Sequence, residues 1–187
     1  YGAGTKVFSL TGHVRRSDVL EVPMGTSLRT IVETMAGGAP AGRRIKAVQT
    51  GGPSGGCVPE SALDTPVDYD SLQALGTIMG SGGMVVMDDT TNMVDIAAFF
   101  MAFSREESCG KCIACRAGTV QLELLLRKLL EHRGSPVDLA ELERLCPVVR
   151  DASLCGLGQS APRPVLSTLR HFRDEDRKST RLNSSHR

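Results

Sequence analysis

The sequence lacks any long hydrophobic run and any marked excess of one charge. Its 187 residues contain no stretch of about 18 consecutive apolar side chains, which excludes a membrane-spanning helix. The net charge is +1, with 7 basic and 9 acidic side chains in residues 1–91 and 11 of each in residues 92–175. The body of the chain therefore offers no general attraction to nucleic acid or anionic lipid, and we expect neither nucleic-acid binding nor membrane insertion.

The chain also lacks an initiator methionine and the hydrophobic segment of a signal peptide. It begins Tyr1-Gly2, so we expect an interior fragment of a longer protein. Residues 176–187 hold the positive excess and show no periodicity, so we expect a disordered tail. This tail resembles the in-frame translation of a sequencing-library adapter, and we exclude it from the fold as an artefact.

The first half alternates short β-rich runs with turn clusters. Apolar spacing after Ser27 predicts one helix, which the pair Gly37-Gly38 ends. The predicted strands are Lys6–Leu10, Leu20–Val22, Ile45–Val48 and Met84–Met87. A small sheet with one packed helix is typical of a β-grasp fold, and we assign that domain to residues 1–90.

The second half has a helical period. Ile96, Phe99, Phe100 and Phe103 lie on one helix face, with Asn92 as a predicted cap. The further helices are predicted at residues 117–131, after a cap-like pair formed by Asp138 and Glu141, and around residues 165–172. Residues 91–175 therefore predict a four-helix bundle. The fold class expected is α+β: a small β-grasp domain followed by a four-helix bundle that binds an iron–sulfur cluster.

Six cysteines carry the chemistry, and three of them form Cys109-x2-Cys112-x2-Cys115. This spacing lets successive thiolates converge on one compact centre, as in cubane iron–sulfur ligation, which needs four thiolates. The candidates for the remote fourth ligand are Cys57, Cys146 and Cys155. Cys146 follows Leu142 and Leu145 on a predicted helix, where core packing is the better interpretation. Cys155 lies in a loop flanked by glycines, where backbone amides can approach sulfur, and we choose it as the fourth ligand.

Other cysteine chemistries compete with this interpretation. Zinc also takes four thiolates, although its structural sites usually pair two Cys-x2-Cys knuckles, and a zinc-stabilised binding module without a redox role is the alternative function. Disulfides are disfavoured because nothing marks the chain as secreted. A redox dithiol of Cys112 and Cys115 would leave Cys109 without a role.

Two segments resemble one protein family. They are Glu107-Ser108-Cys109-Gly110-Lys111-Cys112-x2-Cys115-Arg116-x-Gly118-Thr119 and Ser153-Leu154-Cys155-Gly156-Leu157-Gly158. They closely resemble the flavin-bearing, NADH-oxidising subunit of respiratory complex I and its relatives in NAD(P)-linked hydrogenases and formate dehydrogenases. The glycine loops of the first half look like that family's soluble-ligand-binding β-grasp domain. The resemblance covers roughly residues 5–175.

The resemblance implies a set of ligands, cofactors and partners. The implied [4Fe–4S] ligands are Cys109, Cys112, Cys115 and Cys155, and Leu157 would approach the edge of the flavin. FMN and NAD(P)H would bind in a domain preceding Tyr1, so this fragment alone would not oxidise NADH. The cluster would pass single electrons from FMN to a partner's cluster. The implied partners are a thioredoxin-like [2Fe–2S] subunit and a larger iron–sulfur subunit, in a cytoplasmic complex.

Overall fold

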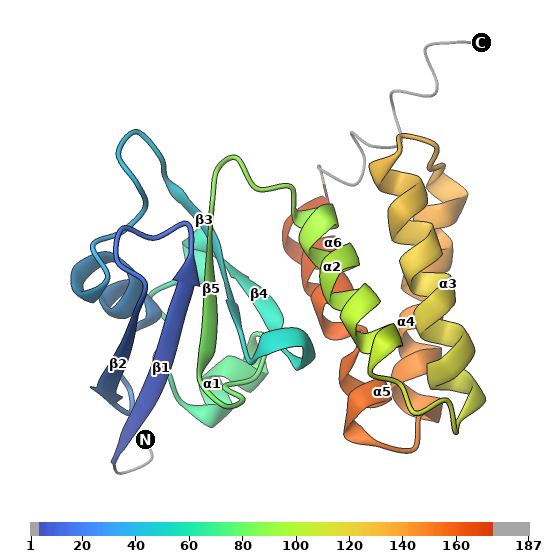
Figure 1. Ribbon diagram of the computed structural model, residues 1–187, viewed down its shortest axis with the longest axis horizontal. Helices are drawn as coiled ribbons and strands as arrows, with labels where there is room; N and C mark the ends of the chain where they lie inside the picture. The colour runs from blue at the N-terminus through green and yellow to red at the C-terminus, as the bar shows by residue number, and fades with distance from the viewer. Residues whose placement is uncertain (1–3, 174–187) are drawn as a thin grey trace. The chain divides into compact units, whose positions relative to one another are not determined.

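The computed structural model describes residues 4–173 and divides into two compact units. The first unit comprises Tyr1–Thr91 and the second Asn92–Arg187, and each is described by itself (Figure 1). The tail expected to be an artefact, residues 176–187, lies outside the described residues. Within the described part of the chain, no helix has both the length and the apolar character needed to cross a bilayer.

A mixed five-stranded sheet forms the first unit. Its strands are β1 (Thr5–Gly12), β2 (Asp18–Pro23), β3 (Ile45–Thr50), β4 (Gly56–Pro59) and β5 (Gly83–Asp88). Their order is β2-β1-β5-β3-β4, with β1 and β5 parallel and every other neighbouring pair antiparallel. The central strand is β5, which is the last strand in the sequence. The antiparallel pair β1–β2 lies on one side of it and the pair β3–β4 on the other.

Short helical segments complete this unit. They are the π-helix η1 (Thr30–Met35), the 3₁₀ turns η2 (Gly52–Ser54) and η3 (Glu60–Ala62), and the helix α1 (Tyr69–Ala74). The π-helix has Arg29 as its N-cap residue, two positions after the predicted cap Ser27, although Ser27 still accepts a hydrogen bond from the backbone N–H of Thr30 at 3.1 Å. One apolar core joins the helices to the sheet; its fully buried members include Phe8, Leu10, Leu28, Ile31, Val48, Val58 and Leu72.

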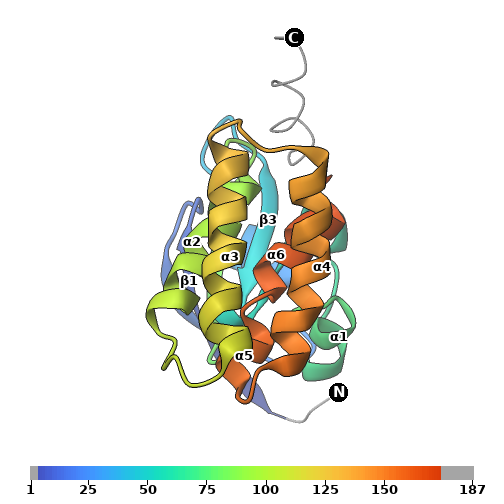
Figure 2. The ribbon, with the colours of Figure 1, turned by 90° about the vertical axis from the view of Figure 1, so that its right-hand side faces the viewer.

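The second unit is helical throughout its described part. Its helices are α2 (Met93–Glu106), α3 (Ile113–Leu130), α4 (Pro136–Ala152), α5 (Gly156–Ser160) and α6 (Arg163–His171). Helix α2 packs on α3 and α6, while α3 packs along α4, as Figure 2 shows for the last pair. The buried residues of these helices meet in one core, which includes Val94, Met101, Leu122, Leu126, Leu142, Cys146 and Val165. The face predicted for α2 is wrong: Phe99 and Phe103 are exposed, and the face that carries Val94 and Met101 packs in the core instead.

Helix starts differ in how well they follow from the sequence. Asn92 caps α2 as predicted, because its side chain accepts from the N–H of Val94. The predicted start of α4 at Asp138 and Glu141 is wrong by one helical turn. Ser135 is the N-cap, and it forms a reciprocal capping box with Asp138, with Pro136 at the first helical position. The Nζ of Lys128 lies 2.7 Å from Asp138 Oδ1 and ties the end of α3 to this cap.

A glycine sets the spacing between α3 and α4. A Cβ placed on Gly118 would lie 2.3 Å from Cγ2 of Val149, a distance that packed atoms do not tolerate. Leu122 and Leu126 continue the same α3 surface and are almost fully buried. The two helices therefore approach closely at the end of α3 that carries the cysteines.

In the first unit, a buried carboxylate closes the turn after β5. The side chain of Asp88 accepts from the Thr90 hydroxyl at 2.6 Å and from the Thr90 N–H at 3.0 Å, and its Oδ1 lies 2.9 Å from His13 Nδ1. The hydroxyl of Thr90 holds the pKa of Asp88 below its usual value; burial opposes this, and the Thr90 N–H and His13 add to it. The end of β5 is thereby joined to the end of β1.

This carboxylate gives a pH-dependent prediction. Because the folded-state pKa of Asp88 is lowered, its contribution to stability is complete above the pKa of the unfolded chain and is lost as the pH falls through the folded value. We expect Asp88→Asn to lower the free energy of unfolding at pH 7 by about 1–2 kcal/mol. The difference between variant and parent should shrink at pH 3. Tyr69 begins α1 in the first unit and the sequence of residues 92–187 contains no tyrosine, so tyrosine fluorescence during urea unfolding reports on the first unit. An equal difference at the two pH values would contradict this account.

Candidate metal centre

Three cysteines lie at the entrance to α3. Cys109 is exposed in the turn after α2, and Gly110 follows it with a positive φ of 72°, which glycine adopts at little cost. Cys112 is the N-cap residue of α3, and Cys115 lies in the first turn of that helix with only 4% of its surface exposed. The guanidinium of Arg116 donates to the carbonyl oxygen of Gly110 at 2.8 Å and so holds the turn against the helix.

The fourth predicted ligand lies at a second helix start. Cys155 is the N-cap residue of α5, a short helix that contacts both α3 and α4. A Cβ placed on Gly158 would lie 2.4 Å from Ser153 Oγ and 3.0 Å from the Cβ of Cys115. Only a residue without a side chain fits there, so the backbone of α5 comes directly against the first turn of α3.

The sulfur of Cys112 lies in a nest of hydrogen-bond donors. The backbone N–H of Leu154 is the main cause that lowers the pKa of the Cys112 thiol below its ordinary value, and the N–H of Cys115 is the second; partial burial opposes them. Leu154 immediately precedes Cys155, so the loop that supplies the fourth cysteine also stabilises the thiolate of the second. A lowered pKa favours the thiolate, which is the form that binds metal.

The pKa of the Cys115 thiol depends on burial and on the other three predicted ligands, Cys109, Cys112 and Cys155. Burial is the largest cause that raises the pKa of its thiol, and a hydrogen bond with the hydroxyl of Ser108 partly offsets this. The nearby thiolates of Cys112, Cys155 and Cys109 raise the pKa further, because like charges repel. The four cysteines predicted as ligands are therefore close enough to interact through their charges.

The two other cysteines lie elsewhere. Cys146 is fully buried in the core of the helical unit, where burial raises the pKa of its thiol to about 12. Cys57 belongs to the first unit, where its buried thiol donates to Oε1 of Gln49 at 2.9 Å. Both behave as packed side chains, in agreement with the core role expected for Cys146.

Two serines near the sulfurs were not predicted to take part. The hydroxyl of Ser108 lies 3.3 Å from Sγ of Cys115, and Ser153 adjoins Cys112 while donating to the carbonyl of Val149 at 2.6 Å. Each serine lies one or two positions before a cysteine in the sequence, and this repeated Ser–Cys proximity is the signal that could have revealed them.

Two further features of the site are the position of Leu157 and the spacing of the side chains that could bind a metal. Leu157, predicted to approach a flavin, is half-buried in the first turn of α5. Among residues 4–173, no three His, Cys, Asp or Glu side chains are grouped closely enough to hold one metal ion. The thiols thus share an electrostatic neighbourhood without forming a compact single-ion site.

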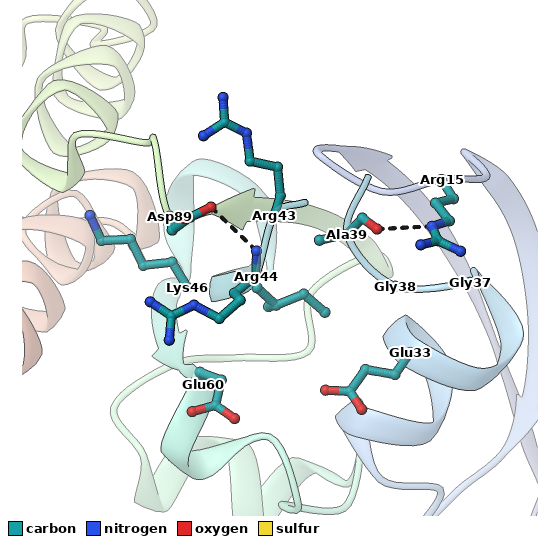
Figure 3. A pocket seen from close by; sticks show the side chains of 11 residues that line it. Arg15, Glu33, Gly37, Gly38, Ala39, Arg43, Arg44, Lys46, Glu60 and Asp89 are labelled. Carbon is teal, nitrogen blue, oxygen red and sulfur yellow. Dashed lines mark hydrogen bonds between the residues drawn. The ribbon is translucent and has the colours of Figure 1, made fainter. Parts of the chain in front are cut away.

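A separate hollow of about 790 Å³ lies in the first unit (Figure 3). Arg15, Arg43, Arg44 and Lys46 line it together with Glu33, Glu60 and Asp89. Nε of Arg15 donates to the carbonyl of Ala39, and Nζ of Lys46 donates to that of Thr91. The Arg43 and Arg44 side chains point in different directions, so these cations do not converge on one point.

Comparison with known proteins identifies the helical unit. Residues 95–179 match the family model described as the NADH-ubiquinone oxidoreductase-F iron-sulfur binding region. The helical unit belongs to this family. The family name specifies a [4Fe–4S] cluster as the cofactor of such a region, which agrees with the cubane chemistry expected from the cysteine spacing.

Relatives extend the similarity over both units. The chain is 48% identical to the NADP-reducing hydrogenase subunit HndC of Solidesulfovibrio fructosivorans and 43% identical to an F-type subunit of the NADH-quinone oxidoreductase of Rhizobium meliloti (strain 1021), in each case over 172 residues and 92% of this chain. It also matches the crystal structure of an NAD+-reducing [NiFe]-hydrogenase in the H2-reduced state, with a TM-score of 0.83 and 31% identity over 94% of this chain.

The chain matches only part of the length of each of these proteins. The chain spans 35% of the length of the first relative, 41% of the second and 29% of the hydrogenase chain. All three belong to oxidoreductases by name. The iron–sulfur binding region of such a protein is therefore present here together with the sheet unit that precedes it.

The close approach at Gly158 yields a prediction for this iron–sulfur binding region. Gly158→Ala should push α5 away from Cys115 and Ser153, because its new Cβ would overlap both side chains. We expect metal binding to weaken roughly 10- to 100-fold, as when a supporting contact of a metal site is lost. Gly156→Ala is the matched control in the same helix, since its Cβ would meet nothing within 4 Å. Iron content after anaerobic reconstitution measures both variants, and equal loading would refute the role of this contact.

Proposed function

We propose that Cys109, Cys112, Cys115 and Cys155 hold a [4Fe–4S] cluster that relays single electrons within an NAD(P)H-oxidising flavin and iron–sulfur oxidoreductase. The observation that carries this proposal is the approach of α5 to α3, where a Cβ on Gly158 would lie 3.0 Å from the Cβ of Cys115; the charges of Cys112, Cys155 and Cys109, which raise the pKa of Cys115, agree with it. Four thiolates are the ligand set that a cubane cluster requires. Each cysteine of such a set binds a different iron, so the sulfurs need not surround a single ion.

Residues of this chain would position the four cysteines, stabilise their thiolates and shield part of the cluster from water. The N–H of Leu154 stabilises the thiolate of Cys112, and the turn closed by Arg116 presents Cys109 at the surface. Burial of Cys115 keeps one side of the centre away from water. When bound, a [4Fe–4S] cluster accepts and donates one electron at a time, so the protein contributes position, dielectric and hydrogen bonds.

The wider protein would supply the two-electron chemistry. By analogy with the named relatives, FMN and NAD(P)H would bind outside this chain, and electrons would leave toward a thioredoxin-like [2Fe–2S] subunit and a larger iron–sulfur subunit. By the same analogy, Leu157 would lie near the edge of the flavin. We place the complex in the cytoplasm, and we expect this chain alone not to oxidise NADH.

We further propose finer assignments for the two units. The strand order β2-β1-β5-β3-β4, with a helical segment between the hairpins, supports a β-grasp domain of the soluble-ligand-binding type in residues 1–90. The packing of α3 on α2 and α4, and of α6 on α2 and α4, supports a four-helix bundle in residues 91–175, with α5 as an additional short helix at the cysteine end.

Spectroscopy of the reconstituted chain tests the cluster. The chain is purified anaerobically, supplied with iron and sulfide, and examined by EPR before and after dithionite. We expect about four irons and four sulfides per chain and an S = 1/2 signal that appears only on reduction. Retention of zinc without iron uptake would instead support a structural zinc module with no redox role.

A pair of cysteine variants tests the ligand assignment. Cys155→Ala should abolish the reduced EPR signal, because it removes one of the four thiolates. Cys146→Ala should retain the signal and cost about 1 kcal/mol of stability, since it removes only a small buried group. Loss of the cluster in Cys146→Ala with full loading of Cys155→Ala would overturn the assignment.

A further inference from the structure

Ser108 stands out among the residues around the cysteines because its hydroxyl faces a sulfur. Its Oγ lies 3.3 Å from Sγ of the buried Cys115. The same oxygen accepts a hydrogen bond from the backbone N–H of Gly110, also at 3.3 Å. A hydroxyl has one proton and two lone pairs, so the N–H of Gly110 uses a lone pair and leaves the proton free to point at the sulfur.

The direction of this hydrogen bond is fixed once Cys115 binds metal. A metal-bound cysteine is a thiolate and has no proton to give. Ser108 must then be the donor, and a bond to an ionised acceptor is stronger than one between neutral groups. The Ser108 hydroxyl is also the cause that offsets, in part, the effect of burial on the pKa of Cys115.

The surrounding structure holds Ser108 in place. Its backbone N–H donates to the carbonyl of Arg105 at the end of α2. The guanidinium of Arg105 lies 2.7 Å from the buried carboxylate of Glu123, which is anchored on α3. Ser108 is therefore attached to the end of α2 and Cys115 lies on α3, and the Arg105–Glu123 ion pair joins these two helices.

Neighbouring hydroxyls have backbone carbonyls as acceptors. Ser153 donates to the carbonyl of Val149 at 2.6 Å, and its hydroxyl is also a lesser cause that lowers the pKa of Cys112. Thr119 donates to the backbone carbonyl of Cys115 at 2.8 Å, away from the sulfur. Ser104, one turn before Ser108, donates to the carbonyl of Phe100 at 3.0 Å. Ser108 differs from these three because, among its described hydrogen bonds, no backbone carbonyl competes with the sulfur of Cys115 for its proton.

We infer that Ser108 is a positioning residue that sets the reduction potential of the cluster through a hydrogen bond to the thiolate of Cys115. This inference rests on the proposed function, because it requires a cluster on Cys115. Donation to a ligand sulfur withdraws electron density from it and stabilises the state that carries one more electron. The one-electron reduction itself involves no bond to serine, and the proton stays on its oxygen.

An EPR-monitored redox titration of the full reconstituted chain tests this role. Ser108→Ala should bind the same amount of iron and sulfide as the parent, with a midpoint potential shifted to a more negative value. Ser108→Thr keeps the hydroxyl and should restore the parent's potential. Ser104→Ala is the matched control, because it removes a buried hydroxyl from the end of the same helix without touching a cysteine. Its potential should equal that of the parent.

The outcomes separate the two proposals. A parent chain that takes up no iron and sulfide overturns the proposed function and this inference together. A loaded Ser108→Ala chain with an unshifted potential overturns the role of Ser108 alone, as does a Ser108→Thr chain that keeps the shift. If Ser108→Ala does not load, Ser108→Cys is titrated in its place. Its thiol is a weaker donor, so a potential equal to the parent's would again overturn the inference.

Discussion

The contact of α5 with the first turn of α3 is the interaction on which the cysteine arrangement depends. It brings the backbone of Gly158 against Cys115 and the N–H of Leu154 to the sulfur of Cys112. Without it, Cys155 would belong to a loop some forty residues along the chain from its partners, as the sequence numbering shows. The contact in turn requires α3 and α4 to pack closely, which Gly118 permits. Packing of α3 on α4, one helical turn beyond Cys115, therefore helps to fix where the sulfurs lie.

Gathering four thiols in this way has an electrostatic cost. Burial raises the pKa of Cys115 most, and repulsion by the neighbouring thiolates raises it further. A cation at the centre removes that penalty, because each metal–sulfur bond replaces a proton. Binding of the cluster should therefore stabilise the fold of the helical unit. Hydrogen bonds from Leu154 and Ser108 relieve part of the same repulsion through donated protons.

The sequence predicted the strongly periodic elements and missed the short ones. The helices α2, α3 and α6 and the strands β1, β3 and β5 are long enough for their periods to be recognised, but the period did not identify the buried face of α2, which carries Val94 and Met101 rather than Phe99. The strand β4 and the helices α1 and α5 were not predicted, because they are only four to six residues long and depend on tertiary contacts. Three of the cysteines follow from local spacing. The contacts of Ser108 and Leu154 do not, since they arise only when α2, α3 and α5 pack together.

The four thiols also differ in exposure, and this asymmetry bears on how a bound cluster would exchange electrons. Cys115 is buried against the helical core, whereas Cys109 and Cys155 are exposed. The side chain of Leu154, next to Cys155, is 78% exposed as well. The buried side lies against the helical core and Ser108, so residues of this chain set its dielectric and hydrogen bonds. Under the proposed function, electrons would therefore enter or leave through the exposed side, which Cys109 and Cys155 form.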